Sequence, residues 1–271
     1  MKKQKSSIFI AYLIYQMATV ISYNVNGIRA AMNKGFLAWL QWENPDIICL
    51  QETKIQRGQI DSSVFTSLGY YHYWHYAVKK GYSGVALLSK QKPDNVVYGM
   101  GISRYDNEGR FLRADFGNIT ICSLYIPSGS MGDERQEFKM QFLHDFYNFA
   151  YDLKKERPQL IISGDYNICH KAIDIHDPKE HEDVSGFLPE ERAWMDDFTG
   201  MGFIDSFRLF DQSPKKYSWW SYRAGARAKN LGWRIDYHMV SEIMHSKLTG
   251  AAILSDVVHS DHCPVKLELV I

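Results

Sequence analysis

The sequence predicts one layered domain that mixes α-helices with β-strands. Three observations lead to this prediction. Short apolar segments rich in β-branched residues recur along the whole chain, longer segments between them show helical periodicity, and 45% of the residues are hydrophobic, which is enough for a large core. No linker, low-complexity segment or short repeat divides the chain. We therefore expect a single domain at residues 18–271, after an extension at residues 1–17.

The extension superficially resembles a secretion signal. Three lysines precede an apolar run at residues 8–15. The run contains two tyrosines, has no small-x-small cleavage site after it, and is too short to span a bilayer as a helix. We interpret residues 1–17 as a non-essential extension, with Met17 as a candidate functional start, and keep secretion as the alternative.

Seven segments have the composition of strands and are bounded by glycine, proline, asparagine or aspartate. They lie at residues 18–23, 46–50, 84–88, 119–126, 160–163, 235–240 and 264–270. Helices are expected between some of them, and the sequence therefore alternates between the two kinds of element as a layered α/β or α+β domain does.

The clearest helix is predicted at residues 133–157. Five apolar side chains recur there at helical spacing, namely Phe138, Phe142, Phe146, Phe149 and Leu153. Asp133 can cap the start of this helix, and Pro158 ends it. Shorter helices are predicted at residues 35–43 and 189–201, the second with a proline in its first turn.

Charge and cysteine content constrain the partners and the compartment. Thirty-one lysine and arginine residues balance thirty-one aspartate and glutamate residues, so nucleic acid would have to be attracted by a local patch. The four cysteines stand far apart without a C-x-x-C pair, at Cys49, Cys122, Cys169 and Cys263. We expect buried free thiols in a reducing cytoplasm, and neither a zinc site nor a disulfide framework.

Acidic and amide side chains, and one histidine, follow the predicted strands where each strand ends. They are Asn24, Asn26, Glu52, Asp165, Asn167, Asp236, Asp261 and His262. Rigid scaffolds place reactive groups at strand ends. Hard oxygen ligands without a cysteine or histidine cluster suit magnesium. Taken singly, each residue also fits an ordinary role, such as a turn or a solvated carboxylate, and only the joint pattern favours a site.

Residues 212–235 contain no acidic residue and interleave cations with aromatic side chains. The cations are Lys215, Lys216, Arg223, Arg227, Lys229 and Arg234, and the aromatics are Tyr217, Trp219, Trp220, Tyr222 and Trp233. Cations can neutralise phosphates, while aromatic faces can receive an unstacked base or a sugar that lacks its base. From composition alone, the commoner interpretation is a basic surface loop whose aromatics belong to the core.

With these segments laid out, the sequence resembles the exonuclease III family of apurinic/apyrimidinic endonucleases, within the endonuclease/exonuclease/phosphatase superfamily. The resemblance runs from about Ala18 to the C-terminus. It rests on ISYNVNGIRAA, DIICLQETK, GYSGVALLS, SLYIPSG, ISGDYNICH with AIDIHDPK, SGFLPEER, NLGWRIDYHMV and HSDHCPV. It implies a four-layered α/β sandwich, with two mixed β-sheets packed face to face, helices outside and the active site at one edge.

The resemblance implies a role for each residue of the site. Glu52 would be the principal magnesium ligand, and Asp261 would lie near a second metal position. The wider set around the metal would be Asn24, Glu52, Asp165, Asn167, Asp261 and His262. Asp165 would position and deprotonate the attacking water, and Asn167 and Tyr125 would bind the scissile phosphate. His262, held by Asp236, would contact a non-bridging phosphate oxygen.

The same resemblance implies the DNA contacts. The DNA-binding set would be Asn26, Arg29, Lys34, Lys54, Ser128, Arg223, Arg227 and Lys229. Trp219, Trp233 and Ile235 would form the pocket for a flipped-out abasic sugar. Asn26 stands where some members of the family have an acidic residue, which would lower the charge around the metal. Ser128 replaces an asparagine and Arg223 an apolar residue, which bears on the balance between incision and exonuclease activity.

The implied activity is hydrolysis of the phosphodiester 5′ to an abasic site, with 3′–5′ exonuclease and 3′-end cleaning as related activities. Magnesium, or manganese as a substitute, would be the cofactor, because diester hydrolysis needs a positioned water and neutralisation of oxygen charge. The expected partner is double-stranded DNA with abasic sites or blocked 3′ ends, and we expect a cytoplasmic monomer that binds no membrane.

Two other classes of function remain open. The first is another phosphoesterase of the superfamily, either a nonspecific DNase or a lipid phosphatase. The GWRIDY block, the basic aromatic segment and the absence of paired cysteines disfavour this class. The second is a DNA-binding protein without catalysis, which is disfavoured because every catalytic position of the family is filled.

Overall fold

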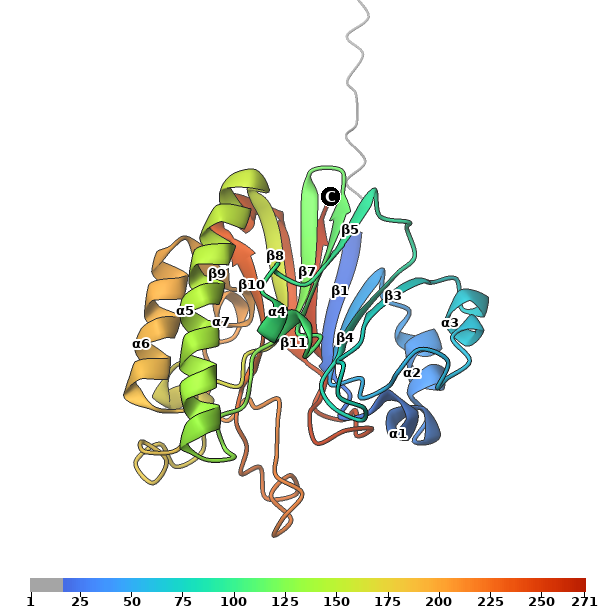
Figure 1. Cartoon of the computed structure of the whole chain (residues 1–271). Coiled ribbons are helices and arrows are strands. Elements are labelled where there is room, and N and C mark those ends of the chain that lie inside the picture. Colours follow the sequence, from blue (N-terminus) through green and yellow to red (C-terminus); the bar gives the residue numbers. More distant parts are fainter. Residues whose placement is uncertain (1–16) are drawn as a thin grey trace, which may run out of the picture.

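Two six-stranded β-sheets pack face to face at the centre of the protein, as the computed structural model of residues 17–271 shows (Figure 1). The first sheet has the order β11 (Leu248–Ile253), β12 (Val265–Val270), β1 (Met17–Asn24), β2 (Ile47–Gln51), β4 (Val85–Ser89) and β3 (Tyr71–His75). The second has the order β5 (Asn95–Tyr98), β6 (Phe111–Phe116), β7 (Ile119–Tyr125), β8 (Gln159–Asp165), β10 (Asp236–Ser241) and β9 (Phe203–Asp205).

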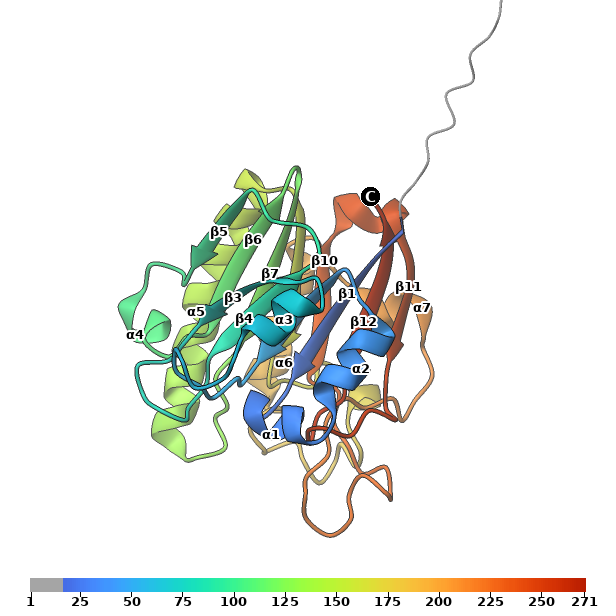
Figure 2. The same cartoon turned by 90° about the vertical axis from the view of Figure 1, so that its right-hand side faces the viewer.

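Helices cover the outer faces of both sheets (Figure 2). The first sheet is covered by α1 (Ile28–Asn33), α2 (Phe36–Glu43) and α3 (Ser63–Ser67), and the second by α5 (Asp133–Glu156) and α6 (Pro189–Gly200). The remaining short helices are α4 (Ser103–Asp106), η1 (Ala172–Asp174), α7 (Ser206–Phe210) and η2 (Glu242–Lys247).

Three apolar clusters lie between the layers. One fills the space between the sheets and includes Leu87 and Ile121, and the other two join the helices to the outer faces of the sheets. Three interfaces define four layers, so the predicted four-layered α/β sandwich is confirmed.

The strand directions decide where the functional residues gather. β1 and β2 are parallel, as are β7 and β8, whereas the other paired strands are antiparallel. Asn24 therefore pairs with Gln51 at the end of one parallel pair, and Tyr125 pairs with Asp165 at the end of the other. The carboxyl ends of parallel strands are a common site for ligands. The long loop after α7, orange in Figure 1, projects from the same edge.

All seven predicted strands exist, and all seven are inner strands of a sheet. Five strands were not predicted from the sequence, namely β3, β5, β6, β9 and β11. Four of these are the edge strands of the two sheets. An edge strand has one neighbour and exposes more side chains, so it need not form an apolar run. The inner strand β6 was missed because Arg113 and Asp115 interrupt its apolar residues.

The three predicted helices correspond to α2, α5 and α6 to within one residue at each end. One detail was wrong, since Asp133 does not cap α5. It is the first helical residue, and Gly132 holds the cap position with a φ of 104°, which favours glycine. Asp133 still places negative charge in the first turn, where the helix dipole favours it. The unpredicted helices have six residues or fewer, too few for a periodic pattern.

The predicted extension at residues 1–17 lies almost wholly outside the described residues. Met17, which we assigned to it, is the first residue of β1 and pairs with Val270. The prediction of buried free thiols is confirmed for all four cysteines. Within residues 17–271, no helix combines the length and apolar character that a membrane crossing requires.

His238 on β10 gives a testable pH dependence of stability. Its ring nitrogens lie 2.7 Å from the Ser163 hydroxyl and 3.0 Å from the Val265 carbonyl, which satisfies a neutral imidazole. Burial lowers the pKa of His238 from 6.5 to about 4. The unfolded chain therefore takes up this proton first, and the stabilisation present above pH 6.5 is lost as the pH falls towards 4.

We expect His238→Gln to reduce the loss of stability between pH 7 and pH 4 by up to about 3 kcal/mol, because one pKa unit corresponds to 1.36 kcal/mol. Glutamine can bond to both neighbours but takes up no proton. Urea unfolding at a series of pH values measures the effect. If the free energy of unfolding of the variant falls as steeply between pH 7 and pH 4 as that of the wild type, His238 does not cause the loss of stability in acid.

Candidate active site

Two carboxylates and one imidazole converge at the edge of the sheets. One donor atom from each of Glu52, Asp165 and His262 lies within 4.8 Å of the other two. The Asn24 side chain stands between the carboxylates, because its Nδ2 donates to Glu52 Oε1 at 2.7 Å and to Asp165 Oδ2 at 2.8 Å. Residues from both sheets therefore form one cluster.

The backbone turns sharply just after the strands that carry this cluster. Asn26, Glu52, Lys54 and Asn167 have φ angles of 44°, 49°, 53° and 52°. This left-handed conformation is uncommon for residues other than glycine and is found most often in asparagine and aspartate. Such strain is tolerated where surrounding contacts compensate for it, and it is frequent at functional sites. The turns project the side chains into the common edge.

Asp236 at the start of β10 orients the ring of His262. The Nδ1 atom of His262 lies 2.9 Å from Asp236 Oδ2, and its Nε2 atom faces Asp165 Oδ2 at 3.9 Å. Burial disfavours the imidazolium, but the Asp236 and Asp165 carboxylates outweigh it and raise the pKa of His262 to about 10. The Asp–His arrangement fixes the orientation of the ring and stabilises its charged form.

The surroundings of Asp165 disfavour the ionised form of its carboxyl group. Burial and the Asp236 carboxylate raise the pKa of Asp165 to about 7. Its Oδ1 atom accepts the backbone N–H of Asn167 at 2.8 Å. The Asn167 side chain donates to the Ile126 carbonyl at 2.9 Å, so Asn167 and Asp165 are held as one turn.

Tyr125, at the end of β7, lies next to the cluster, because it pairs with Asp165 in the sheet. Burial and the nearby Glu52 carboxylate raise the pKa of Tyr125 well above its usual value, so its hydroxyl is a neutral donor at neutral pH. The guanidinium of Arg110 lies 4.7 Å from the centre of the Tyr125 ring and donates to the Tyr125 carbonyl. Glu108 pairs with Arg110 at 2.6 Å and holds it in place.

Asp261 lies beside the cluster but outside the group of three. It accepts hydrogen bonds from Asn26 Nδ2 at 2.9 Å and from Trp219 Nε1 at 3.1 Å. Burial raises the pKa of Asp261, but His262 and these hydrogen bonds lower it below the usual value overall. Asp261 therefore links the acidic cluster to the aromatic side chain of Trp219.

The residues of the predicted abasic pocket pack together. Trp219, Trp233 and Ile235 belong to one apolar cluster, which also contains Cys169, Ile175 and Phe187. The rings of Trp219 and His262 have their centres 6.4 Å apart. The aromatic wall is thus continuous with the acidic cluster.

Five of the cations and polar residues predicted to bind DNA lie in exposed or half-exposed positions, namely Arg29, Lys34, Ser128, Arg223 and Lys229. Lys54 reaches into the cluster, with its Nζ 2.8 Å from Glu52 Oε2. Lys34 donates to the His259 carbonyl at 3.1 Å and lies 6.0 Å from the centre of the Tyr222 ring. Lys54 thus adds a positive charge to the acidic cluster itself.

Two arginines of the basic segment are used inside the protein. Arg227 donates to the backbone carbonyls of Ser255, Val257 and Ser260 and stacks on Trp220. Arg234 is buried and pairs with Asp174 and Asp205, both at 2.7 Å. The sequence pattern counted both as surface cations, because it could not show their acceptors. These contacts hold loops of the site together, and the DNA contact predicted for the half-exposed Arg227 stays a prediction.

Sequence reasoning missed Arg110, Lys139 and Glu191. Lys139 is fully buried, and its Nζ donates to the Asn167 carbonyl at 2.8 Å and pairs with Glu191. One signal was available, because Lys139 lies three residues before Phe142 and seven before Phe146, on the apolar face of α5. A charged residue at a core position needs a buried partner.

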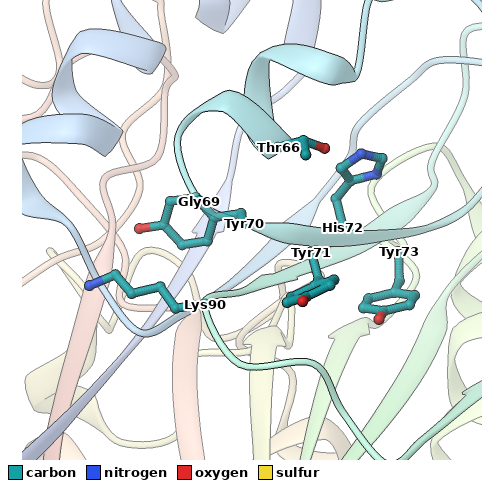
Figure 3. A pocket seen from close by; sticks show the side chains of 7 residues that line it. All are labelled: Thr66, Gly69, Tyr70, Tyr71, His72, Tyr73 and Lys90. Carbon is teal, nitrogen blue, oxygen red and sulfur yellow. The ribbon is translucent and has the colours of Figure 1, made fainter.

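Three pockets lie elsewhere, and their lining residues include none of Glu52, Asp165 and His262. One of about 530 Å³ is lined by Thr66, Gly69, Tyr70, Tyr71, His72, Tyr73 and Lys90 (Figure 3). In Figure 3 the Tyr71 and Tyr73 rings lie on one face of β3, and His72 lies on the other. Tyr71 pairs with Ser89, whereas His75 at the other end of β3 pairs with Val85 near the acidic cluster. The pocket therefore lies at the far end of the strands.

The cluster fits a hard divalent cation. Its donors are two carboxylates and one imidazole nitrogen, with an amide between the carboxylates, and oxygen donors predominate. Burial and repulsion by the Asp236 carboxylate raise the pKa of Asp165, and a bound cation would favour its ionised form. Asn24 presents its N–H group to both carboxylates, so it could bind a metal only after its amide turns over.

Comparison with known proteins agrees with this arrangement. Residues 21–262 match the sequence profile of the Endonuclease/Exonuclease/phosphatase family. An exodeoxyribonuclease of Bacillus subtilis (strain 168) is 46% identical over 250 residues, which are 92% of this chain and 98% of that protein. A DNA-(apurinic or apyrimidinic site) endonuclease of Dictyostelium discoideum is 37% identical over 250 residues, which are 91% of this chain and 69% of that protein.

A solved structure extends the comparison to three dimensions. The AP endonuclease from Archaeoglobus fulgidus matches with a TM-score of 0.84 and 26% sequence identity, covering 92% of this chain and 98% of that one. The likeness includes the two-sheet core that carries the site. The chain therefore belongs to the endonuclease/exonuclease/phosphatase family and, within it, to the exonuclease III and apurinic/apyrimidinic endonuclease group.

Proposed function

We propose that this protein is a magnesium-dependent nuclease that hydrolyses the phosphodiester 5′ to abasic sites in double-stranded DNA. One observation carries the proposal. The cluster of Glu52, Asp165 and His262, which could hold a metal ion, adjoins the apolar cluster of Trp219, Trp233 and Ile235 through the contact of Trp219 with His262. The first part suits phosphodiester hydrolysis, and the second suits a sugar that has lost its base.

Four side chains share the chemistry. Asp165 accepts the proton of the attacking water, and its position is set by the Asn167 backbone. The Tyr125 hydroxyl donates to the phosphate, as does the imidazolium of His262, which neutralises developing oxygen charge. Glu52, with Asp165, would hold a magnesium ion, which when bound would supply Lewis acidity at the phosphate, and manganese could replace it.

We attribute selectivity for abasic sites to the aromatic side chains of Trp219 and Trp233. A base is too large for a small cluster of packed aromatic side chains, and extruding it costs stacking energy that the abasic position has already lost. Exposed cations such as Arg29, Lys34 and Lys229 grip phosphates on either side without reading sequence. We also propose that the enzyme acts as a monomer and trims blocked 3′ ends.

A divalent-metal titration tests the function. The substrate is a duplex with one synthetic abasic site, and the controls are the undamaged duplex and a phosphoinositide. Incision 5′ to the abasic site that depends on magnesium and is much slower on both controls is expected. Equal cleavage of the undamaged duplex would indicate a nonspecific DNase, phosphate release from the lipid would indicate a lipid phosphatase, and binding without cleavage would indicate a protein without catalysis.

Trp233→Ala should narrow the ratio of incision rates between abasic and undamaged duplex, because the pocket would lose the wall that excludes a base. Trp233 is almost fully buried, so rates must be measured well below the melting temperature of the variant. Trp42→Ala, which removes an exposed tryptophan of α2, is the matched control. If Trp233→Ala lowers the incision rate by the same factor on the abasic and the undamaged duplex, Trp233 is a core residue or a general DNA contact.

A further inference from the structure

A buried ion pair lies behind the site, and the proposed chemistry does not use it. Lys139 on α5 and Glu191 on α6 have fully buried side chains, with Nζ 2.5 Å from Oε1. Taking two charges out of water is costly, and replacing such a pair by apolar residues is often neutral or stabilising. Stability alone therefore does not explain why these residues are charged.

The lysine end of the pair contacts the catalytic turn. Besides Glu191, Lys139 Nζ donates to the carbonyl of Asn167 at 2.8 Å. Asn167 has a left-handed backbone, and its N–H holds Asp165 Oδ1. Lys139 thus fixes the peptide whose strained conformation aims both side chains at the site.

The glutamate end holds a wall of the aromatic pocket. Glu191 Oε2 accepts the backbone N–H of Gly186 at 2.6 Å and of Leu188 at 3.0 Å. Gly186 lies against Trp233, since a Cβ atom added there would be 2.8 Å from its ring. Its carbonyl also accepts the N–H of Cys169, two residues after Asn167, at 2.7 Å.

We propose that Lys139 and Glu191 are positioning residues that hold the catalytic turn at Asn167 and the pocket wall at Gly186 in one fixed arrangement. The proposal rests on the proposed function, since it assigns the pocket and the turn to the same substrate. It requires that loss of the pair slows the chemical step and narrows the preference for abasic DNA together. A purely structural pair would lower only the melting temperature.

The test uses Lys139→Met combined with Glu191→Gln, which removes both charges and leaves none unpaired. Lys139→Arg keeps the charge and serves as the conservative variant if the double variant does not fold. The matched control is Arg113→Met, because Arg113 and Asp115 form a largely buried pair on β6 at 2.9 Å. Asp115 pairs with Thr120 near the turn between β6 and β7, at the end of the sheet away from the site.

Single-turnover incision of the abasic duplex is measured well below each melting temperature. The double variant should cut at least about tenfold more slowly with unchanged DNA affinity, since a displacement of about 1 Å can cost a hundredfold in rate. The rate ratio of abasic to undamaged duplex should also fall. Arg113→Met should keep the wild-type rate, and Lys139→Arg should recover part of the loss.

Repeating the double substitution in a protein that already carries Asn167→Ala separates a positioning role from a general loss of activity. Adding the double variant to Asn167→Ala should cause little further loss, because residues that act through one unit are not additive. If the double variant and Asn167→Ala each lower the cleavage rate by the same factor whether or not the other is present, the proposal is overturned. A wild-type cleavage rate in the double variant would also overturn it. If the double variant does not fold, a wild-type rate in Lys139→Arg would do so.

Amide hydrogen exchange without DNA separates this inference from the proposed function. Exchange at residues 166–169 and 186–188 should be at least about tenfold faster in the double variant and unchanged in Arg113→Met. If only Lys139→Arg folds, exchange in both segments should be faster than in the wild type, by a smaller factor. A wild-type protein that does not cut abasic DNA would overturn the function, yet the exchange result would still decide whether the pair holds both segments. Unchanged exchange in both segments would overturn the positioning role.

Discussion

Asp165→Asn should slow single-turnover cleavage of abasic DNA by at least about a hundredfold, the lower range for loss of a general base. Asparagine has nearly the same shape but cannot accept the proton of the water. Its single oxygen also replaces the two carboxylate oxygens that accept from Asn167 N and from Asn24 Nδ2. DNA affinity should be retained, because the exposed cations are untouched.

The measurement pairs a rapid-quench time course with a binding titration on the same duplex. Asp152→Asn, which alters an exposed aspartate of α5, is the control and should leave both unchanged. If Asp165→Asn cuts at nearly the wild-type rate, another group activates the water and the assignment of Asp165 is wrong.

Glu52→Gln should raise the magnesium concentration needed for half-maximal incision by at least about tenfold, by analogy with the loss seen when groups supporting a metal ligand are removed. The reason is loss of a hard anionic ligand, and Lys54 would lose its ion-pair partner at 2.8 Å as well. Excess metal should restore part of the activity. The folded state should be little affected, because Glu52 lies in a half-exposed turn.

Metal titrations of incision and of binding by calorimetry check this result. Glu43→Gln is the matched control, because Glu43 on α2 also pairs with a lysine, Lys266, at 3.4 Å. Its titration should match that of the wild type. An unchanged midpoint in Glu52→Gln would remove Glu52 from the metal site.

The inner strands could be predicted because their burial on both faces is written into short local runs, as in IICLQ of β2. The edge strand β3, YHYWH, is aromatic and half-exposed, and it depends on pairing with β4 to be a strand at all. Cooperative pairing is not visible in a local pattern, and the same composition could form a loop.

The candidate site was predictable to a similar degree. Polar residues at strand ends indicated Glu52, Asp165 and Asp236, because strand ends collect at a sheet edge. The support around them was not predictable, as Arg110 beneath Tyr125 shows. A basic residue next to an apolar strand gives no local sign of the ring on which it stacks.

The sequence by itself determined the fold class, the inner strands, the long helix and the chemical nature of the cluster, because these depend on local composition and on the order of segments. The tertiary structure alone decided which partner each polar group has. Asn24 meets Asp165 across 141 residues, Lys139 meets Glu191 across 52, and Arg234 is buried although its neighbours in sequence suggested a surface cation. Electrostatic interactions depend on distance in space and on burial, and neither is a property of a local segment.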